Sequence, residues 1–401
     1  MYKSLALRVT IKISKHKGDY RNLNENFFDS KLMAEAVELA EKHKSVLHEI
    51  PEVGMEEYRT TEYIKKVCDG YDLRYTDLGM DTGLVAYLDA EKDDCIALRA
   101  DIDALPTDNG PNHLCGHDAH TSTMLGALHY LCNAKDSLKS NVLFIFQPSE
   151  EGTKGAKNMI AAGLWDKIPA MPKWIFGIHN RPEKNVGDVV VHRGPLMSAK
   201  SEFCITLTGR SGHSSTPHVC IDPIVAAAQL ITGIQSIKSK NVDPAAHAIC
   251  SINSIKAGEP NIPMPDEAVI TGFFRSYDSK VHARMDERVR KIAEATADAF
   301  ECKCDIQIVP AADAIINSDE MYEIGYKAAE IAVGKEHIID SEPCMASEDF
   351  SYFGEYVPSF FYWVGSGAPG KYNAPWHDAN FRVAEGYFEA AVPVLTAPAL
   401  I

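Results

Sequence analysis

Residues 95–103 read Cys95-Ile96-Ala97-Leu98-Arg99-Ala100-Asp101-Ile102-Asp103, an apolar run of strand length that ends in two carboxylates. Similar apolar runs occur at residues 142–146 and 174–178, and polar residues follow each of them. Nearly continuous apolar runs are typical of strands that are buried on both faces. Helical patterns at residues 122–132 and 154–162 separate these strands. The sequence therefore predicts an α/β domain with a mainly parallel sheet flanked by helices.

Chemically active side chains follow these predicted strands. In parallel sheets ligands gather beyond the carboxyl ends of the strands, and here those ends carry Asp101, Asp103, Glu150, Glu151 and His179. Neighbouring carboxylates repel each other unless separate partners hold them, so a divalent metal could hold one glutamate and leave the other free as a base. Each residue alone also fits an ordinary turn, a solvated loop or a core histidine.

A second motif, Cys115-Gly116-His117-Asp118-Ala119-His120, puts a thiol, two imidazoles and a carboxylate into six residues. Thiolate, imidazole and carboxylate are ligands of zinc and its first-row neighbours, although a polar helix start is the alternative. Five potential ligands, enough for two metal ions if one of them bridges, come from distant parts of the chain: Cys115, His117, Glu151, His179 and His377.

The pattern changes after Pro195. Residues 202–208 alternate apolar and polar side chains, as expected of a strand with one solvated face. The next predicted elements, in the order helix, strand, strand, helix and strand, are residues 222–238, 248–255, 268–274, 279–300 and 304–309. The order β-α-β-β-α-β is that of a ferredoxin-like split unit. We therefore expect residues 196–309 to form an inserted α+β domain within a catalytic domain of residues 1–195 and 310–401.

The α/β pattern covers the remainder of the catalytic domain. Residues 31–47 carry apolar side chains at helical spacing, with Asp29 or Ser30 available as the N-cap. Residues 365–377 are rich in Gly, Pro and Ala and should form a loop. Further helices and strands of this domain are expected at residues 59–67, 84–88, 320–333 and 360–364.

Composition narrows the classes of partner. The chain has 401 residues, 45% hydrophobic and 24% charged, as in ordinary globular proteins. Its formal net charge of -16 argues against a nucleic-acid partner. No apolar run reaches membrane-spanning length, and the ten cysteines lack the regular spacing of a disulfide scaffold. We expect a cytoplasmic protein that binds neither nucleic acid nor membranes.

Six stretches of the sequence together resemble the M20 metallopeptidase superfamily, specifically its aminoacylase and amidohydrolase branch with the hippurate hydrolases and auxin-conjugate hydrolases. The stretches follow the family order and are residues 98–106, 113–120, 147–152, 177–179, 212–218 and 347–351. The resemblance implies a site with two divalent metal ions and Cys115 as the bridging ligand. The ligands it implies are Cys115, His117, Glu151, His179 and His377.

The same resemblance implies roles for residues around the metals. Glu150 is expected to act as general base and acid, and Asp103 falls where the superfamily has an aspartate that orients a metal-bound histidine. His213 and Asn261, in the inserted domain, match groups that reach the scissile carbonyl, the histidine often from the other subunit of a dimer. Arg275 sits where related enzymes hold the substrate carboxylate. A homodimer through the inserted domain is therefore expected.

The resulting hypothesis is a metal-dependent amidohydrolase that cleaves N-acyl amino acids or small amide conjugates to a carboxylic acid and an amino acid. Zinc, manganese, cobalt and nickel all tolerate this ligand mixture. The alternatives are a dipeptidase of the same superfamily, a protein that uses Cys115 as a covalent nucleophile, and a catalytically inactive metal-binding or regulatory protein. The connection between Asp103 and Cys115 is also much shorter than the family usually carries.

Overall fold

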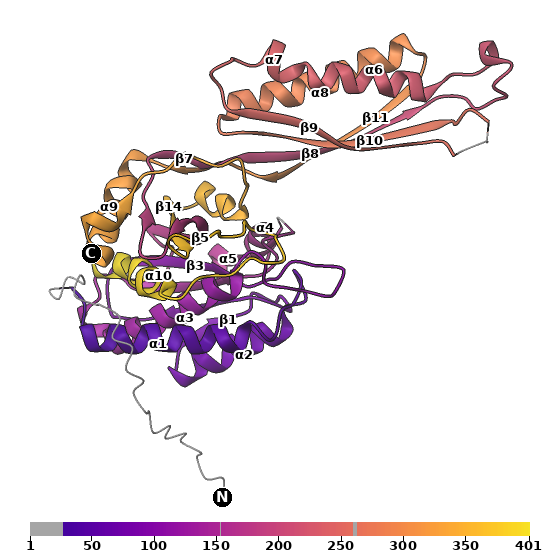
Figure 1. Ribbon diagram of the computed structural model, residues 1–401. Helices are drawn as coiled ribbons and strands as arrows, with labels where there is room; N and C mark the ends of the chain where they lie inside the picture. Colours follow the sequence, from indigo (N-terminus) through magenta and orange to yellow (C-terminus); the bar gives the residue numbers. More distant parts are fainter. Residues whose placement is uncertain (1–26, 153, 260–262) are drawn as a thin grey trace, which may run out of the picture.

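The structure is a computed structural model that describes residues 27–152, 154–259 and 263–401. Figure 1 shows a larger body, formed by chain on both sides of an insertion, and a smaller body that extends away from it on long strands. The predicted fold class, a mainly parallel α/β body with an inserted α+β unit, is confirmed.

An eight-stranded sheet forms the centre of the larger body. Its central pairs β4–β3, β3–β5 and β5–β14 are parallel, whereas β2 joins β4 in the antiparallel direction. In spatial order the strands are β1 (Arg74–Thr76), β2 (Leu84–Leu88), β4 (Asn141–Gln147), β3 (Cys95–Asp101), β5 (Trp174–Asn185), β14 (Ser359–Gly367), β6 (Val189–Val190) and β13 (Ile338–Ile339). All residues of β2, β3 and β4 are buried, as expected for strands covered on both faces.

Helices pack on both faces of this sheet and bury separate apolar clusters. One face carries α1 (Ser30–Leu47), α2 (Tyr58–Gly70), α3 (His117–Asn133), α9 (Asp319–Val333) and α10 (Tyr387–Thr396). The other face carries α4 (Gly155–Ala161), α5 (Leu164–Lys167) and the 3-10 helix η5 (Asp349–Glu355). The side chain of Asp29 accepts hydrogen bonds from the amides of Lys31 and Leu32, which confirms it as the N-cap of α1.

The smaller body is an antiparallel four-stranded sheet with helices on one face. Its strands, in spatial order, are β11 (Lys303–Ala312), β8 (Ala199–Thr208), β10 (Glu267–Ser276) and β9 (Ala248–Ala257). Its helices are α6 (Pro223–Gln235), α7 (Ile237–Asn241) and α8 (Ser279–Ala299). Phe203, Ile205 and Leu207 of β8 are buried under the helices, so the alternate residues of the strand face the other way.

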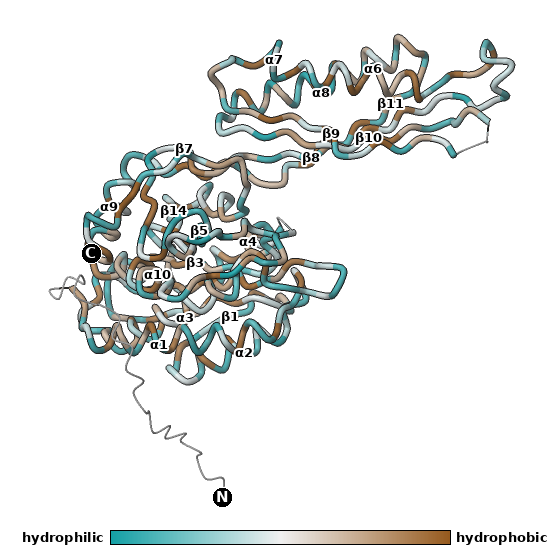
Figure 2. Tube along the Cα trace, in the orientation of Figure 1, coloured by the Kyte–Doolittle hydropathy of each residue, from teal (hydrophilic) through white to brown (hydrophobic). Residues whose placement is uncertain are grey.

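A short antiparallel pair, β7 (Gly194–Met197) and β12 (Ile315–Asn317), lies where the chain passes between the two bodies. Coloured by hydropathy, α1 and α8 alternate between hydrophobic and hydrophilic residues along their length (Figure 2), as expected for helices with one buried face. Within the described ranges, no helix combines the length and apolarity needed to cross a bilayer. All ten cysteines are free thiols.

Two boundaries differ from the sequence-based expectation in ways that matter for the site. The helix predicted from Ser122 begins five residues earlier, at His117, and Gly116 precedes it with φ +89°. A Cβ atom at Gly116 would lie only 2.5 Å from Asn180 Nδ2, so glycine is required by both backbone and packing. The expected helix 222–238 is divided at Ser236 into α6 and α7.

Candidate metal centre

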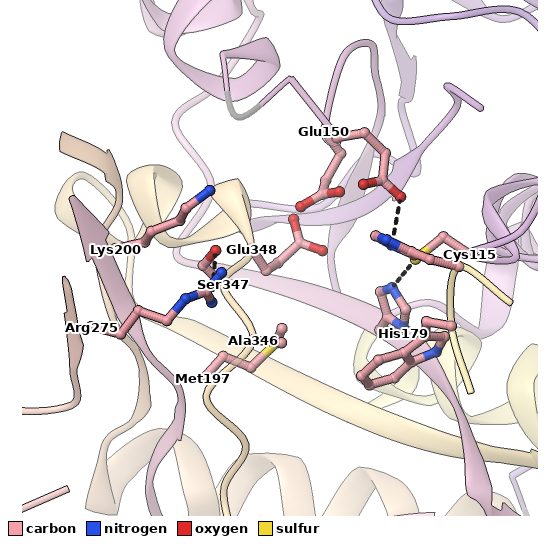
Figure 3. Close-up of a pocket in the computed structure, with 12 residues that line it drawn as sticks. Cys115, Glu150, His179, Met197, Lys200, Arg275, Ala346, Ser347 and Glu348 are labelled. Carbon is pink, nitrogen blue, oxygen red and sulfur yellow. Dashed lines mark hydrogen bonds and ion pairs between the residues drawn. The ribbon is translucent and has the colours of Figure 1, made fainter. Parts of the chain in front are cut away.

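A cavity of about 400 Å³ lies between the two bodies, and both contribute residues to its wall. Figure 3 shows a cationic group from the smaller body at one end of the cavity and thiol, imidazole and carboxylate groups of the larger body at the other. The lining residues are Cys115, Glu150, Glu151, His179, Met197, Lys200, Arg275, Ala346, Ser347, Glu348, Trp376 and His377.

The structure brings all five predicted metal ligands together. Cys115 Sγ lies 3.5 Å from His179 Nε2 at the end of the parallel sheet. Glu151 Oε1 lies 3.9 Å from His117 Nε2 and 3.4 Å from His377 Nε2. The ligand atoms form two overlapping groups, each within 4.8 Å, which are Cys115–His117–His179 and Cys115–Glu151–His377. Cys115 is the member that the two groups share.

The protein atoms at this site fit divalent metal ions. His117 Nε2 and Glu151 Oε1 are buried and have no hydrogen-bond partner among the described residues. A buried polar atom without a partner costs about 1–3 kcal/mol, so two of them facing each other indicate a group that the protein atoms do not supply. One sulfur, three imidazole nitrogens and a carboxylate match the donor preferences of zinc and its first-row neighbours.

Asp103 holds two of the ligand-bearing residues in place. Its Oδ1 lies 3.0 Å from His117 Nδ1, and its Oδ2 accepts a hydrogen bond of 3.0 Å from the backbone amide of Glu151. The carboxylate therefore orients the imidazole so that Nε2 points into the ligand group. Burial of His117 lowers its pKa, but the neighbouring Asp101 and Cys115 and the hydrogen bond to Asp103 outweigh this effect and raise the pKa well above its usual value.

Comparison with known proteins identifies the family of this chain. The sequence pattern of the family described as Peptidase family M20/M25/M40 matches residues 97–398, which include all five predicted ligands. The chain belongs to this family. The M20 membership expected from the motifs is therefore confirmed.

A deacetylase and an amino acid hydrolase match this M20 chain over most of their length. An N-acetyl-L-cysteine deacetylase of Bacillus subtilis is 35% identical over 84% of this chain and 82% of its own. An IAA-amino acid hydrolase of Arabidopsis thaliana is 29% identical over 86% of this chain and 80% of its own. The crystal structure of a dinuclear metal binding peptidase from the M20 family of B. subtilis aligns with a TM-score of 0.75 and 29% identity, covering 93% of this chain and 98% of that chain.

Glu150 lies next to the ligand group of the M20 site. Its Oε2 is 3.9 Å from His117 Nε2, and its side chain lines the cavity. Burial raises the pKa of the Glu150 carboxyl well above its usual value, and neighbouring Glu348 and Glu151 raise it further. Burial likewise raises the pKa of the Cys115 thiol, so the protein groups alone do not activate this thiol as a nucleophile.

A buried arginine organises the carboxylates behind the cavity. Arg99 is fully buried and pairs with Asp101 Oδ2 at 2.9 Å, Glu348 Oε1 at 2.8 Å and Asp349 Oδ1 at 3.2 Å. Burial raises the pKa of Asp349 to about 8, although Arg99 opposes the shift. The sequence predicted no role for Glu348 beyond its place in a family motif, although its side chain lines the cavity.

The short connection before the cysteine folds as a tight turn. Leu105 and Asn112 exchange two backbone hydrogen bonds of 3.1 Å and 2.9 Å, and Gly110 adopts φ +100° between them. The Thr107 hydroxyl donates a hydrogen bond of 2.6 Å to the Gly110 carbonyl. The chain therefore passes from Asp103 to Cys115 without a long loop over the cavity entrance.

The expected substrate-binding residues do not all lie in the cavity. Arg275 lines the cavity, where its Nη1 donates to the Met345 carbonyl and lies 3.4 Å from Ser347 Oγ. His213 is exposed on the smaller body, with its Nδ1 2.7 Å from Ser215 Oγ, and it does not line the cavity. Asn261 lies outside the described residues. The cavity residue Lys200, in contrast, was not singled out from the sequence.

Proposed function

We propose that this M20 protein is a metal-dependent amidohydrolase that cleaves N-acyl amino acids or small amide conjugates to a carboxylic acid and an amino acid. The observation that carries the proposal is the pair of ligand groups sharing Cys115, beside Glu150 and in the same cavity as Arg275. The deacetylase and hydrolase named above support this reaction, since each releases an amino acid from an N-acyl derivative.

The proposal includes two divalent metal ions, drawn from zinc, manganese, cobalt and nickel. When bound, such ions lower the pKa of a water molecule and polarise a carbonyl oxygen. The residues proposed to hold them are Cys115, His117, Glu151, His179 and His377. The dinuclear site of the related B. subtilis peptidase supports a count of two.

Glu150 is proposed to move the proton during hydrolysis. Its carboxylate lies within reach of the ligand group and is shielded from solvent, so it can accept a proton from the attacking water. The same carboxyl group then donates that proton to the nitrogen of the leaving amine. Asp103 acts through His117, whose ring it orients, and is therefore proposed as a positioning residue.

Substrate binding in the proposal uses residues of the smaller body, taken as an inserted domain of residues 196–309. The planar guanidinium of Arg275 suits the α-carboxylate of an N-acyl amino acid. His213 and Asn261 are proposed to contact the scissile carbonyl. Because His213 does not line the cavity of its own chain, its role requires a second subunit. The active form is thus proposed to be a cytoplasmic homodimer.

Glu150→Gln provides the main test. The amide keeps the shape of the side chain but cannot accept the proton, so turnover should fall by about 10²- to 10⁴-fold. Metal content, measured by elemental analysis after gel filtration, should stay close to the wild-type value. The matched control is Glu56→Gln, which changes an exposed residue outside the cavity and should keep full activity. Retained turnover in Glu150→Gln would exclude the proposed proton transfer.

A substrate panel separates the amidohydrolase from a dipeptidase. N-acetyl and N-benzoyl amino acids and unmodified dipeptides are to be compared at equal concentration with the metal-supplemented protein. Release of amino acid from the N-acyl compounds, with much slower release from dipeptides, is the expected result. Bound metal without hydrolysis of any compound in the panel would instead favour a binding protein.

A further inference from the structure

Two cationic side chains of the smaller body face the cavity from adjacent strands. Lys200 of β8 and Arg275 of β10 are register partners in an antiparallel pair, so both side chains leave the same face of the sheet. The opposite face is covered by the helices, where Phe203 and Phe274 are buried. Figure 3 shows both cations at the end of the cavity away from Cys115.

Arg275 can hold one carboxylate without help. Its two protein contacts, with the Met345 carbonyl and Ser347 Oγ, both use Nη1. Among the described residues, Nε and Nη2 of this guanidinium have no hydrogen-bond partner, and they form the edge that binds a carboxylate in a bidentate manner. The α-carboxylate of the proposed substrate class therefore needs only Arg275.

Lys200 supplies a second positive charge that the α-carboxylate does not require. Its side chain is 19% exposed, and its Nζ lies 2.5 Å from Glu202 Oε1 on the same strand. An ammonium group has three donors, so this contact leaves capacity for another anion. Partial burial strengthens the attraction between Lys200 and an anion in the cavity relative to that of a fully solvated lysine. Glu202 is 59% exposed and can yield its position to such an anion.

The charges of the opposite wall limit where an anionic substrate group can lie. Glu150 and Glu348 line the cavity toward the metal-ligand end, where the proposed metal ions take the scissile amide, so Lys200 and Arg275 at the other end are the protein cations available to a further carboxylate. The cationic end, with Lys200 and Arg275, is next to the position proposed for the amino-acid part of the substrate. A second substrate carboxylate is therefore expected on the amino-acid side of the amide.

We infer that Lys200 binds the side-chain carboxylate of the substrate and that the preferred substrates are N-acyl derivatives of acidic amino acids. This inference rests on the proposed function. Arg275 holds the α-carboxylate, and Lys200 holds the carboxylate of a glutamate or aspartate side chain. The two cations thus select an amino acid that carries two negative charges.

Matched substrates test this selection. N-acetyl-glutamate and N-acetyl-glutamine have the same shape but differ in one charge, so wild-type protein supplied with Mn²⁺ should favour the glutamate compound by roughly 10-fold or more in kcat/KM. Lys200→Met should remove most of this preference, leaving roughly equal kcat/KM for the two compounds, mainly through a higher KM for N-acetyl-glutamate. Turnover of N-acetyl-glutamine should stay within about 2-fold of wild type.

Two control variants separate the effect of the Lys200 charge from a general effect of substitution on the structure. Lys200→Arg keeps the charge and should retain part of the preference, and Lys303→Met, on the exposed start of β11, should change nothing. Calorimetric binding of free glutamate and glutamine reports on the same contact without turnover, and Lys200→Met should weaken only glutamate binding. Equal turnover of the two N-acetyl compounds, or an unchanged preference in Lys200→Met, would overturn the role of Lys200. If the protein hydrolyses none of the N-acyl amino acids tested, the proposed function itself is overturned.

Discussion

Asp103 Oδ1 lies 3.0 Å from Nδ1 of His117, whose Nε2 is buried and has no hydrogen-bond partner in the described chain. The carboxylate therefore fixes which imidazole nitrogen is available to a metal ion. Asp103→Asn keeps the size of the side chain but removes its charge. We expect the affinity for divalent metal to fall by about 10- to 100-fold, measured by titration of the metal-depleted protein.

The control for this substitution is Asp108→Asn, an exposed residue in the turn between Asp103 and Cys115. Its metal affinity should equal that of wild type. An unchanged affinity in Asp103→Asn would show that packing alone orients His117.

The proposed dimer predicts that two inactive variants rescue each other. In a mixed dimer of Glu150→Gln and His213→Ala subunits, the site in the second subunit has its own Glu150 and receives His213 from the first. A 1:1 mixture allowed to exchange subunits should reach about a quarter of wild-type activity, because half of the dimers are mixed and each has one intact site. Absence of any rescue, with exchange shown by mass spectrometry, would place His213 outside the partner's site.

Removal of the buried arginine should destabilise the larger body. Arg99→Met leaves Asp101, Glu348 and Asp349 without their common cation, and removing one partner of a buried ion pair costs about 3–5 kcal/mol. The free energy of unfolding from denaturant titration at pH 7 measures this loss. Arg59→Met, which removes a guanidinium that is 60% exposed and pairs with Glu52, should change stability by no more than about 1 kcal/mol.

Glu57 predicts a pH dependence of stability. Burial raises the pKa of Glu57 from 4.5 to about 7, while its Oε1 accepts a hydrogen bond of 2.7 Å from the Ser149 amide. Between these pKa values the folded state holds the proton more tightly than the unfolded state. The contribution of Glu57 to the free energy of unfolding is therefore full below pH 4.5 and is lost as the pH rises through 7.

Glu57→Gln removes the titration and should therefore stabilise the protein at pH 8, by up to about 3 kcal/mol. Thermal unfolding followed from pH 5 to pH 8 should show a flatter profile in this variant than in wild type. Glu56→Gln, at the exposed neighbouring residue, should leave the profile unchanged. A parallel downward shift of the Glu57→Gln curve at all pH values would instead indicate lost hydrogen bonding.

The sheet of the larger body could be predicted because its strands are apolar along their whole length. The runs at residues 95–100 and 142–146 correspond to β3 and β4, which are buried at every position. Helix α10 was not predicted. Of its ten residues all but Glu389 are buried, so it lacks the polar face that reveals a surface helix, and it contains Pro393.

The candidate metal ligands could be predicted because their side-chain types are unusual at strand ends and the family motifs fix their order. The start of α3 was placed too late because His117, Asp118 and His120, in its first turn, are polar yet buried. Lys200 could not be recognised, because a lysine in an alternating strand normally faces solvent. Its place in the cavity depends on how the two bodies pack, which local sequence does not encode.

The position of the cavity between two bodies has a consequence for the end of the reaction. The ligand group belongs to the larger body, whereas Lys200 and Arg275 belong to strands of the smaller one. In the proposed binding mode, an intact substrate would therefore link the two bodies through its own covalent bonds. In the proposed binding mode, cleavage of the amide would leave each fragment with a different body, and a hinge movement at β7 and β12 would carry the amino acid away from the acid and expose both to solvent.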